Sequence, residues 1–195
     1  MSLYALIVFV HVAAAVALLS GSVLGSPAIR AAVRRAQSVQ ELRAALAIGR
    51  PLQALEPGSA VVVLVTGLYL TRVADFWSLG WVQVAVAAWL VNAGVAGAVV
   101  QPAVKAVAGQ AAIAPDGPVG PHLDALRWSR HWSIGGDVLL ANDAAMLWLM
   151  TMQPDLAGSL LAVAGVMVGV AGARAIRHAW GHTGIASEAS AAGRN

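Results

Sequence analysis

Residues 132–154, WSIGGDVLLANDAAMLWLMTMQP, have the length and apolar character of a membrane-spanning helix, yet they carry three polar side chains in the interior. These side chains are Asp137, Asn142 and Asp143. An ionised group at the centre of a spanning helix costs roughly 2.5 to 3.5 kcal/mol on insertion scales, so it normally faces a partner, a cavity or a ligand. We therefore expect this helix to lie inside a helical bundle and to carry functional residues.

The whole chain has the composition of a polytopic membrane protein. Of its 195 residues, 59% are hydrophobic and 11% are charged, whereas roughly 25% of residues are charged in soluble domains. The basic residues lie beside hydrophobic segments instead of forming a basic domain, so we expect the lipid bilayer and no nucleic acid as a partner. There is no cysteine, and no nucleophile, phosphate-loop or zinc-protease motif is found, which leaves open whether the protein is an enzyme.

Hydrophobic runs predict an all-α bundle of five spanning helices, at 3–25, 56–73, 79–104, 132–153 and 156–176. They form one domain, residues 1–182, and the polar tail at 183–195 is expected to be disordered. The amphipathic stretch 39–50 predicts a helix lying on the membrane surface. Glu56 and Pro57 are interpreted as the beginning of the second spanning helix, where an acidic residue and a proline are both favourable.

The basic residues predict the orientation of the bundle. With five spans, eleven of the twelve Lys and Arg residues lie on one side of the membrane, and only Arg72 lies on the other. The positive-inside rule then places the N-terminus outside and the C-terminus in the cytoplasm, in the inner membrane of a bacterial cell.

A polar layer is expected near the middle of the bundle. At about 1.5 Å per residue, His11, Asn92 and Asp143 lie roughly 12 to 20 Å below the outer surface. His11 is the only histidine within the predicted hydrocarbon core, and Met146 shares a helical stripe with Asp143.

Three interpretations of this layer remain open. The first is a structural cluster of buried polar side chains that satisfy one another. The second is a haem b site in which His11 is an axial ligand and Met146 is the best second ligand. The third is a Cu(I) site formed by His11 and Met146 with Met150 and Met152.

Three stretches resemble a known group of proteins. The first helix, LIVFVHVAAAVALLSG at 6–21, and the segments LRWSRHWS and MLWLMTMQP are similar to parts of small bacterial integral membrane proteins. That group includes a family of unknown function, the HemJ-type protoporphyrinogen oxidases and the CopD-type copper-resistance domain. The resemblance implies a haem-binding bundle in which His11 matches the histidine of the first helix, and Arg127 and Arg130 match the basic approach to the fourth helix.

Three functional hypotheses follow from the sequence. In the first, the protein is a haem b redox protein that exchanges electrons with quinone. In the second, it is a non-catalytic accessory subunit packed against other membrane subunits, and a separate alternative is a membrane protein that handles copper or another cation. In the third, Asp137 and Asp143 belong to a proton or cation path, although six residues of helix place them on different faces.

Overall fold

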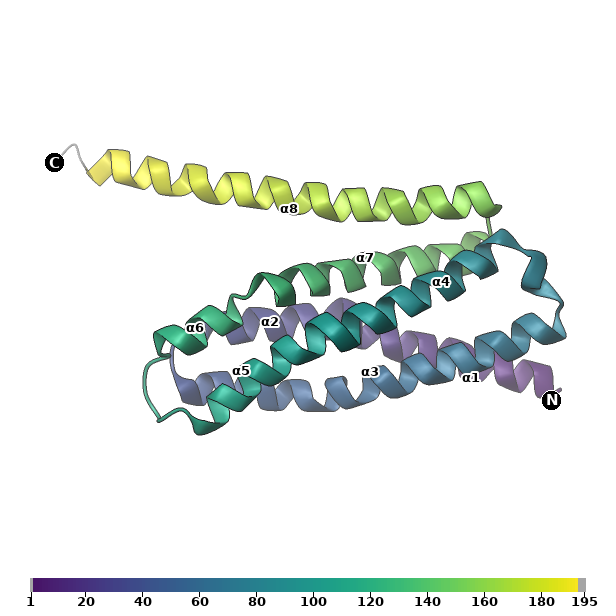
Figure 1. The fold of residues 1–195 in the computed structure, drawn as a ribbon, viewed down its shortest axis with the longest axis horizontal. Coiled ribbons are helices and arrows are strands. Elements are labelled where there is room, and N and C mark those ends of the chain that lie inside the picture. The colour runs from purple at the N-terminus through teal and green to yellow at the C-terminus, as the bar shows by residue number, and fades with distance from the viewer. Residues whose placement is uncertain (1, 193–195) are drawn as a thin grey trace.

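The computed structural model describes residues 2–192, with the backbone alone for Gln53 and for residues 177–192. The described chain is entirely helical, and its five long helices run up and down beside one another (Figure 1). In chain order the elements are α1 (Leu3–Leu19), η1 (Ser20–Gly25), α2 (Ser26–Arg35), α3 (Val39–Val73), η2 (Phe76–Ser78), α4 (Gly80–Val95), η3 (Ala96–Val100), α5 (Gln101–Ile113), α6 (Pro121–Arg127), α7 (Arg130–Met152) and α8 (Leu156–Ala192). The all-α bundle is therefore confirmed.

Four of the long helices are long and apolar enough to cross a membrane: Leu3–Arg35, Val39–Val73, Gly80–Ile113 and Leu156–Ile176. Helix α7 is not among these four, although the sequence predicted it as a span. Its interior Asp and Asn residues lower its hydropathy, and they are turned toward neighbouring helices, which lets a less apolar helix lie within the bundle.

The helices are longer than predicted because two of them contain π-helical turns and continue. The segments α1, η1 and α2 form one continuous helix, as do α4, η3 and α5. At about 1.5 Å per residue, helices of 33 to 35 residues reach roughly 50 Å, well beyond a hydrocarbon core of about 30 Å. These helices are therefore longer than a membrane crossing requires.

The predicted surface helix at 39–50 is wrong, because this stretch is the first part of the 35-residue helix α3. Helix α3 begins after Ser38, whose hydroxyl accepts from the Glu41 amide at 3.2 Å, while the Glu41 carboxylate accepts from the Gln37 amide at 2.8 Å. This reciprocal pattern stabilises a helix N-terminus. Pro57 therefore lies inside a helix, and Glu56 does not cap one.

The apolar face of residues 39–50 packs against protein instead of lipid. It contributes to an apolar core at the end of the bundle where α5 and α6 lie. This core includes Val33, Leu42, Val107, Leu123 and Trp132. All five side chains are at most 5% exposed. The stretch is amphipathic, as predicted, but its apolar face packs against α2, α5 and α6.

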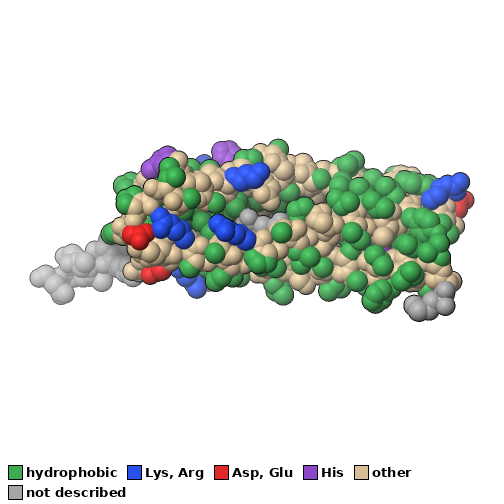
Figure 2. All heavy atoms as spheres, turned by 90° about the horizontal axis from the view of Figure 1, so that it is seen from below, with side chains coloured by type: hydrophobic (Ala, Val, Ile, Leu, Met, Phe, Trp, Pro, Cys, Tyr) green, Lys and Arg blue, Asp and Glu red, His purple; other side chains and the backbone are tan. Residues whose placement is uncertain are grey.

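The rest of the bundle differs from this core in its exposed apolar side chains. Large apolar side chains are exposed along the candidate spans, for example Phe9, Leu161 and Val168 at 67%, 73% and 70%, as expected for surfaces that face lipid. Figure 2 shows Lys and Arg side chains gathered toward the end where α5 and α6 lie, with hydrophobic side chains covering much of the other half. Apart from Arg72, the basic residues of the described chain belong to segments that meet at the end where α5 and α6 lie.

Helix α8 packs mainly along α7 and then α4 (Figure 1). Its backbone continues as helix to Ala192, into the tail that we expected to be disordered from residue 183. Residues 193–195 lie outside the described part of the chain.

Candidate functional site: an intramembrane cavity with two carboxyl groups

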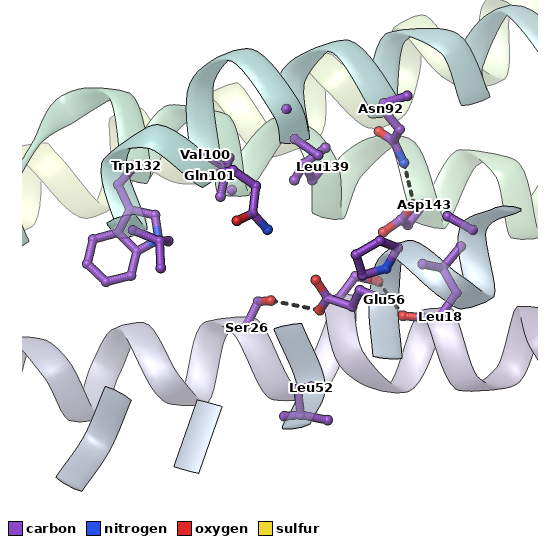
Figure 3. A pocket seen from close by; sticks show the side chains of 18 of the residues that line it. Leu18, Ser26, Leu52, Glu56, Asn92, Val100, Gln101, Trp132, Leu139 and Asp143 are labelled. Atoms are coloured by element: carbon purple, nitrogen blue, oxygen red, sulfur yellow. Dashed lines mark hydrogen bonds between the residues drawn. The ribbon is translucent and has the colours of Figure 1, made fainter. Parts of the chain in front are cut away.

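A cavity of about 590 Å³, here called the central cavity, lies within the bundle. All four of the helices around it contribute side chains: the α1–α2 helix, α3, the α4–α5 helix and α7. Its apolar lining includes Leu18, Leu52, Val100 and Leu139, and Figure 3 shows these side chains around the same space as two acidic residues. Volumes of about 300 to 1,000 Å³ with few polar groups are typical of small-molecule sites.

The first acidic residue, Asp143, is held at the end of a chain of amide groups. Asn142 donates to the Ala88 carbonyl and to the Asn92 side-chain oxygen, both at 2.8 Å. Asn92 in turn donates to the Asp143 carboxylate at 2.5 Å. Asp143 and Asn142 are each 4% exposed. The contact between Asn92 and Asp143 is the part of the predicted polar layer that the structure contains.

The second acidic residue, Glu56, comes from α3 and was not predicted as a site residue. The Ser26 hydroxyl of α2 donates to its carboxylate at 3.1 Å (Figure 3). A Cβ atom at Gly21 would lie only 2.8 Å from the Glu56 Cγ, so the glycine allows α3 to approach closely. Glu56 and Asp143 both line the central cavity and interact electrostatically with each other.

Both π-helical turns contribute to the wall of this cavity. Ser22 belongs to η1, and Ala96, Gly97 and Val100 belong to η3. A π-helical turn inserts an extra residue into a helix and is frequent at functional sites. Here the turns bring hydroxyl and small side chains to the same space as the two carboxyl groups.

The end of the central cavity nearest the basic half of the protein carries Arg30 and Lys105. Lys105 is exposed, so its ammonium group can reach the aqueous boundary. Arg30 donates to the Trp132 and Ser133 carbonyls at 3.5 and 3.3 Å and pairs with Asp137 at 3.5 Å. The acidic pair and the basic groups therefore lie at opposite ends of the central cavity.

The His11 side chain does not lie with Asn92 and Asp143, as the predicted polar layer required. Its Nδ1 lies 2.9 Å from the Thr66 hydroxyl, between α1 and α3. That hydroxyl donates to the Val62 carbonyl at 2.5 Å, so we assign Nδ1 of His11 as the donor to Thr66. His11 does not belong to the lining of the central cavity, whereas Asn92, Asp143 and Met146 do.

The methionines of the predicted copper site are also separated. Met146 lines the central cavity, but Met150 and Met152 are 37% and 64% exposed on the surface of α7. Among the described residues, no group of three or more His, Cys, Asp and Glu side chains could hold a metal ion. His11 does not line the cavity beside Met146, and the copper site stays a prediction.

The two arginines implied by the family resemblance differ in their surroundings. Arg127 is 9% exposed and donates to the carbonyls of Val33 and Ala36 at the end of α2, and to Asp124 at 2.7 Å. It is a helix cap, because it satisfies carbonyl groups that have no partner within α2. Arg130 is exposed at the start of α7. Neither arginine belongs to the lining of the central cavity.

Asp137 lies on another face of α7 from Asp143, as the helical spacing predicted. Its carboxylate accepts from Arg174 of α8 at 2.7 Å and pairs with Arg30 of α2. It therefore joins three helices and does not continue a path from Asp143.

The chain matches no family model, and none of the curated proteins or solved structures compared with it is significantly similar. The resemblance to small bacterial membrane proteins accordingly stays a prediction.

Proposed function

We propose that this multi-pass membrane protein binds a small, largely apolar cation in its central cavity and carries or senses that cation in the membrane. The observation that supports this proposal is the meeting of Glu56 and Asp143, from two helices far apart in the chain, in one cavity with an otherwise mainly apolar wall. Ionisable residues inside membrane bundles typically mark the paths or sites of ions and substrates.

The chemistry of the wall favours an organic cation over a bare proton or metal ion. A cavity of about 590 Å³ is far larger than a metal ion or a proton relay needs, and its Leu, Val and Trp side chains suit an apolar body. Two carboxyl groups favour positive charge, because opposite charges at about 4 Å gain roughly 4 kcal/mol in the partly screened interior of a protein. Trp89 adds an aromatic surface, with its indole N–H donating to the Ala60 carbonyl at 3.1 Å.

The test uses two probes of nearly the same size and shape but opposite charge, tetraphenylphosphonium and tetraphenylborate. We expect the purified protein in neutral detergent to bind the phosphonium specifically, above the partition into empty micelles measured by equilibrium dialysis. Glu56→Gln and Asp143→Asn should each weaken this binding by about tenfold, since each removes one negative charge from the cavity.

Asp75→Asn is the matched control for these variants. Asp75 is exposed in the turn after α3 and has φ of 56°, a left-handed conformation that Asn accepts readily. This variant should bind the phosphonium as the parent does. Equal binding of the two probes, or unchanged binding after both cavity substitutions, would refute the proposal.

The predicted cofactors are handled separately. The residues around the central cavity do not fit a haem ligated by His11, because that side chain lies between α1 and α3. Haem b, copper, exchange with quinone and assembly with other membrane subunits stay predictions.

The proposed orientation has the N-terminus outside and the C-terminus in the cytoplasm of a bacterial cell, with the protein in the inner membrane. It is supported by the gathering of basic residues at the end of the bundle formed by α5 and α6 (Figure 2). In this orientation the acidic pair lies toward the membrane interior, and the basic end of the cavity faces the cytoplasm.

A further inference from the structure

A second pocket, of about 560 Å³, lies between α2, α7 and α8 and is here called the arginine pocket. Its wall is apolar where Pro27, Leu140, Val170 and Ile176 contribute, and Arg30 and Asp137 lie in the same wall. It opens on the other side of α7 from Asp143, so nothing in the proposed cation site accounts for it.

The charged groups around this pocket do not cancel. Asp137 pairs with Arg174 at 2.7 Å and with Arg30 at 3.5 Å. Arg34 lies one turn further along α2 and interacts electrostatically with all three of these residues. Two guanidinium groups thus contact one carboxylate and a third lies one helical turn away, which leaves an excess of two positive charges among these four residues.

Arg34 is held in place by neutral groups. It donates to the Ser133 hydroxyl at 2.5 Å, and its guanidinium carbon lies 4.9 Å above the Trp128 ring. Its Nε is buried and has no hydrogen-bond partner among the described residues. The Arg34 charge is therefore held in position without a direct carboxylate contact, as expected for a site that binds an anion.

The position of the pocket indicates the kind of anion. Arg174 is the first charged residue after the apolar run 156–173 of α8, so the charged groups lie where the apolar surface of α8 gives way to the basic end of the protein. Val170 and Leu140 continue the pocket wall toward the apolar half. Basic pockets between membrane helices at this boundary suit phospholipid head groups.

We propose that the arginine pocket binds one anionic phospholipid. The phosphodiester group lies near Arg34 and Arg174, and an acyl chain lies along Leu140, Val170 and Ile176. A guanidinium group suits a phosphate oxygen because it offers several N–H donors in a planar fork. The apolar wall favours a lipid over free phosphate, which has no apolar part to bury.

The experiment measures phosphatidylglycerol binding to the full-length protein by native mass spectrometry, with phosphatidylcholine as the neutral lipid. We expect one phosphatidylglycerol molecule to remain bound under conditions that remove phosphatidylcholine. Arg174→Gln and Arg34→Gln should each weaken phosphatidylglycerol binding by about fivefold, the effect of one basic residue near a lipid surface.

Arg35→Gln is the matched control, because Arg35 is exposed on the same helix and its loss changes the net charge equally. It should leave phosphatidylglycerol binding within twofold of the parent. If Arg174→Gln fails to fold, Arg174→Lys keeps the positive charge and removes the planar fork, and it should fold and bind the lipid more weakly.

Three results would overturn the proposal. One is equal retention of the two lipids, and another is an equal loss of binding in the Arg35 and Arg174 variants, which would indicate general attraction to a basic surface. The third is displacement of phosphatidylglycerol by millimolar inorganic phosphate, which would make the pocket a site for free phosphate.

Discussion

Arg127 shows how a single side chain can hold one end of the bundle together. Its guanidinium group joins the last carbonyls of α2 to Asp124 of α6 and is almost fully buried. Removing a buried, hydrogen-bonded charge leaves its partners without donors and typically costs about 3 kcal/mol or more. The role of Arg127 is therefore structural, although the sequence resemblance connected it with a cofactor.

We predict that Arg127→Ala lowers the free energy of unfolding by about 3 kcal/mol, which corresponds to a fall of roughly 6 to 12 °C in melting temperature. Arg130→Ala should change stability by less than about 0.5 kcal/mol, because Arg130 is exposed. Thermal melts of both variants in the same detergent provide the measurement. Similar melting temperatures for the two variants would contradict the capping role.

At the residue scale, the level of a polar side chain along its helix could be predicted from the sequence, but the neighbouring helix that it faces could not. Counting along the helices placed Asn92 and Asp143 at one level, and their side chains are hydrogen-bonded. The same count placed His11 at that level, yet its ring faces Thr66 on α3. Distance along a helix does not determine which neighbour a side chain faces, because that depends on how each helix is rotated about its axis.

At the element scale, the membrane half was more predictable than the end where α5 and α6 lie. Long apolar runs identified each of the long helices, because the bilayer sets their minimum length. Pro57 suggested the start of a helix, but it lies inside α3. Packing of α3 against α2 and α5 compensates for the lost backbone hydrogen bonds, and single-sequence patterns do not reveal such tertiary contacts.

Glu56 was misinterpreted for the same reason. An acidic residue followed by proline is typical of a helix start, but here the helix begins at Val39. The Ser38 to Glu41 capping pattern was the signal in the sequence that could have shown this. With the helix extended, Glu56 moves from an expected surface position to the wall of the central cavity.

The packing of α1 on α3 gives a direct prediction. The chain has no cysteine, so introduced cysteine pairs can be cross-linked without background. We expect His11→Cys with Thr66→Cys to cross-link readily with a short thiol reagent, because the native side chains are 2.9 Å apart at their polar atoms.

His11→Cys with Met146→Cys serves as the comparison pair, because a shared ligand site would bring these two residues together. This pair should not cross-link, since Met146 lines the central cavity and His11 does not. Gel mobility of the protein after protease cleavage between the helices reports either product. Efficient cross-linking of the second pair alone would restore the cofactor site predicted from the sequence.

At the scale of the whole molecule, the bundle has two ends with different kinds of packing. The end where α5 and α6 lie has a core of apolar side chains from α2, α3, α5, α6 and α7. The membrane half encloses a cavity and connects its helices through hydroxyl, amide and carboxyl groups. The packed end can therefore hold the helices in place while the cavity remains open to a ligand.

The central claim is that Glu56 and Asp143 act together on one bound cation. A double-mutant cycle of tetraphenylphosphonium binding, with Glu56→Gln, Asp143→Asn and both together, tests this claim most directly. Because each carboxylate partly substitutes for the other, we predict that the double variant loses about fivefold more affinity than the product of the single losses, a coupling of about 1 kcal/mol. A double variant that loses no more affinity than the single variant with the larger loss would show that only one carboxyl group acts on the cation, and would contradict the shared site.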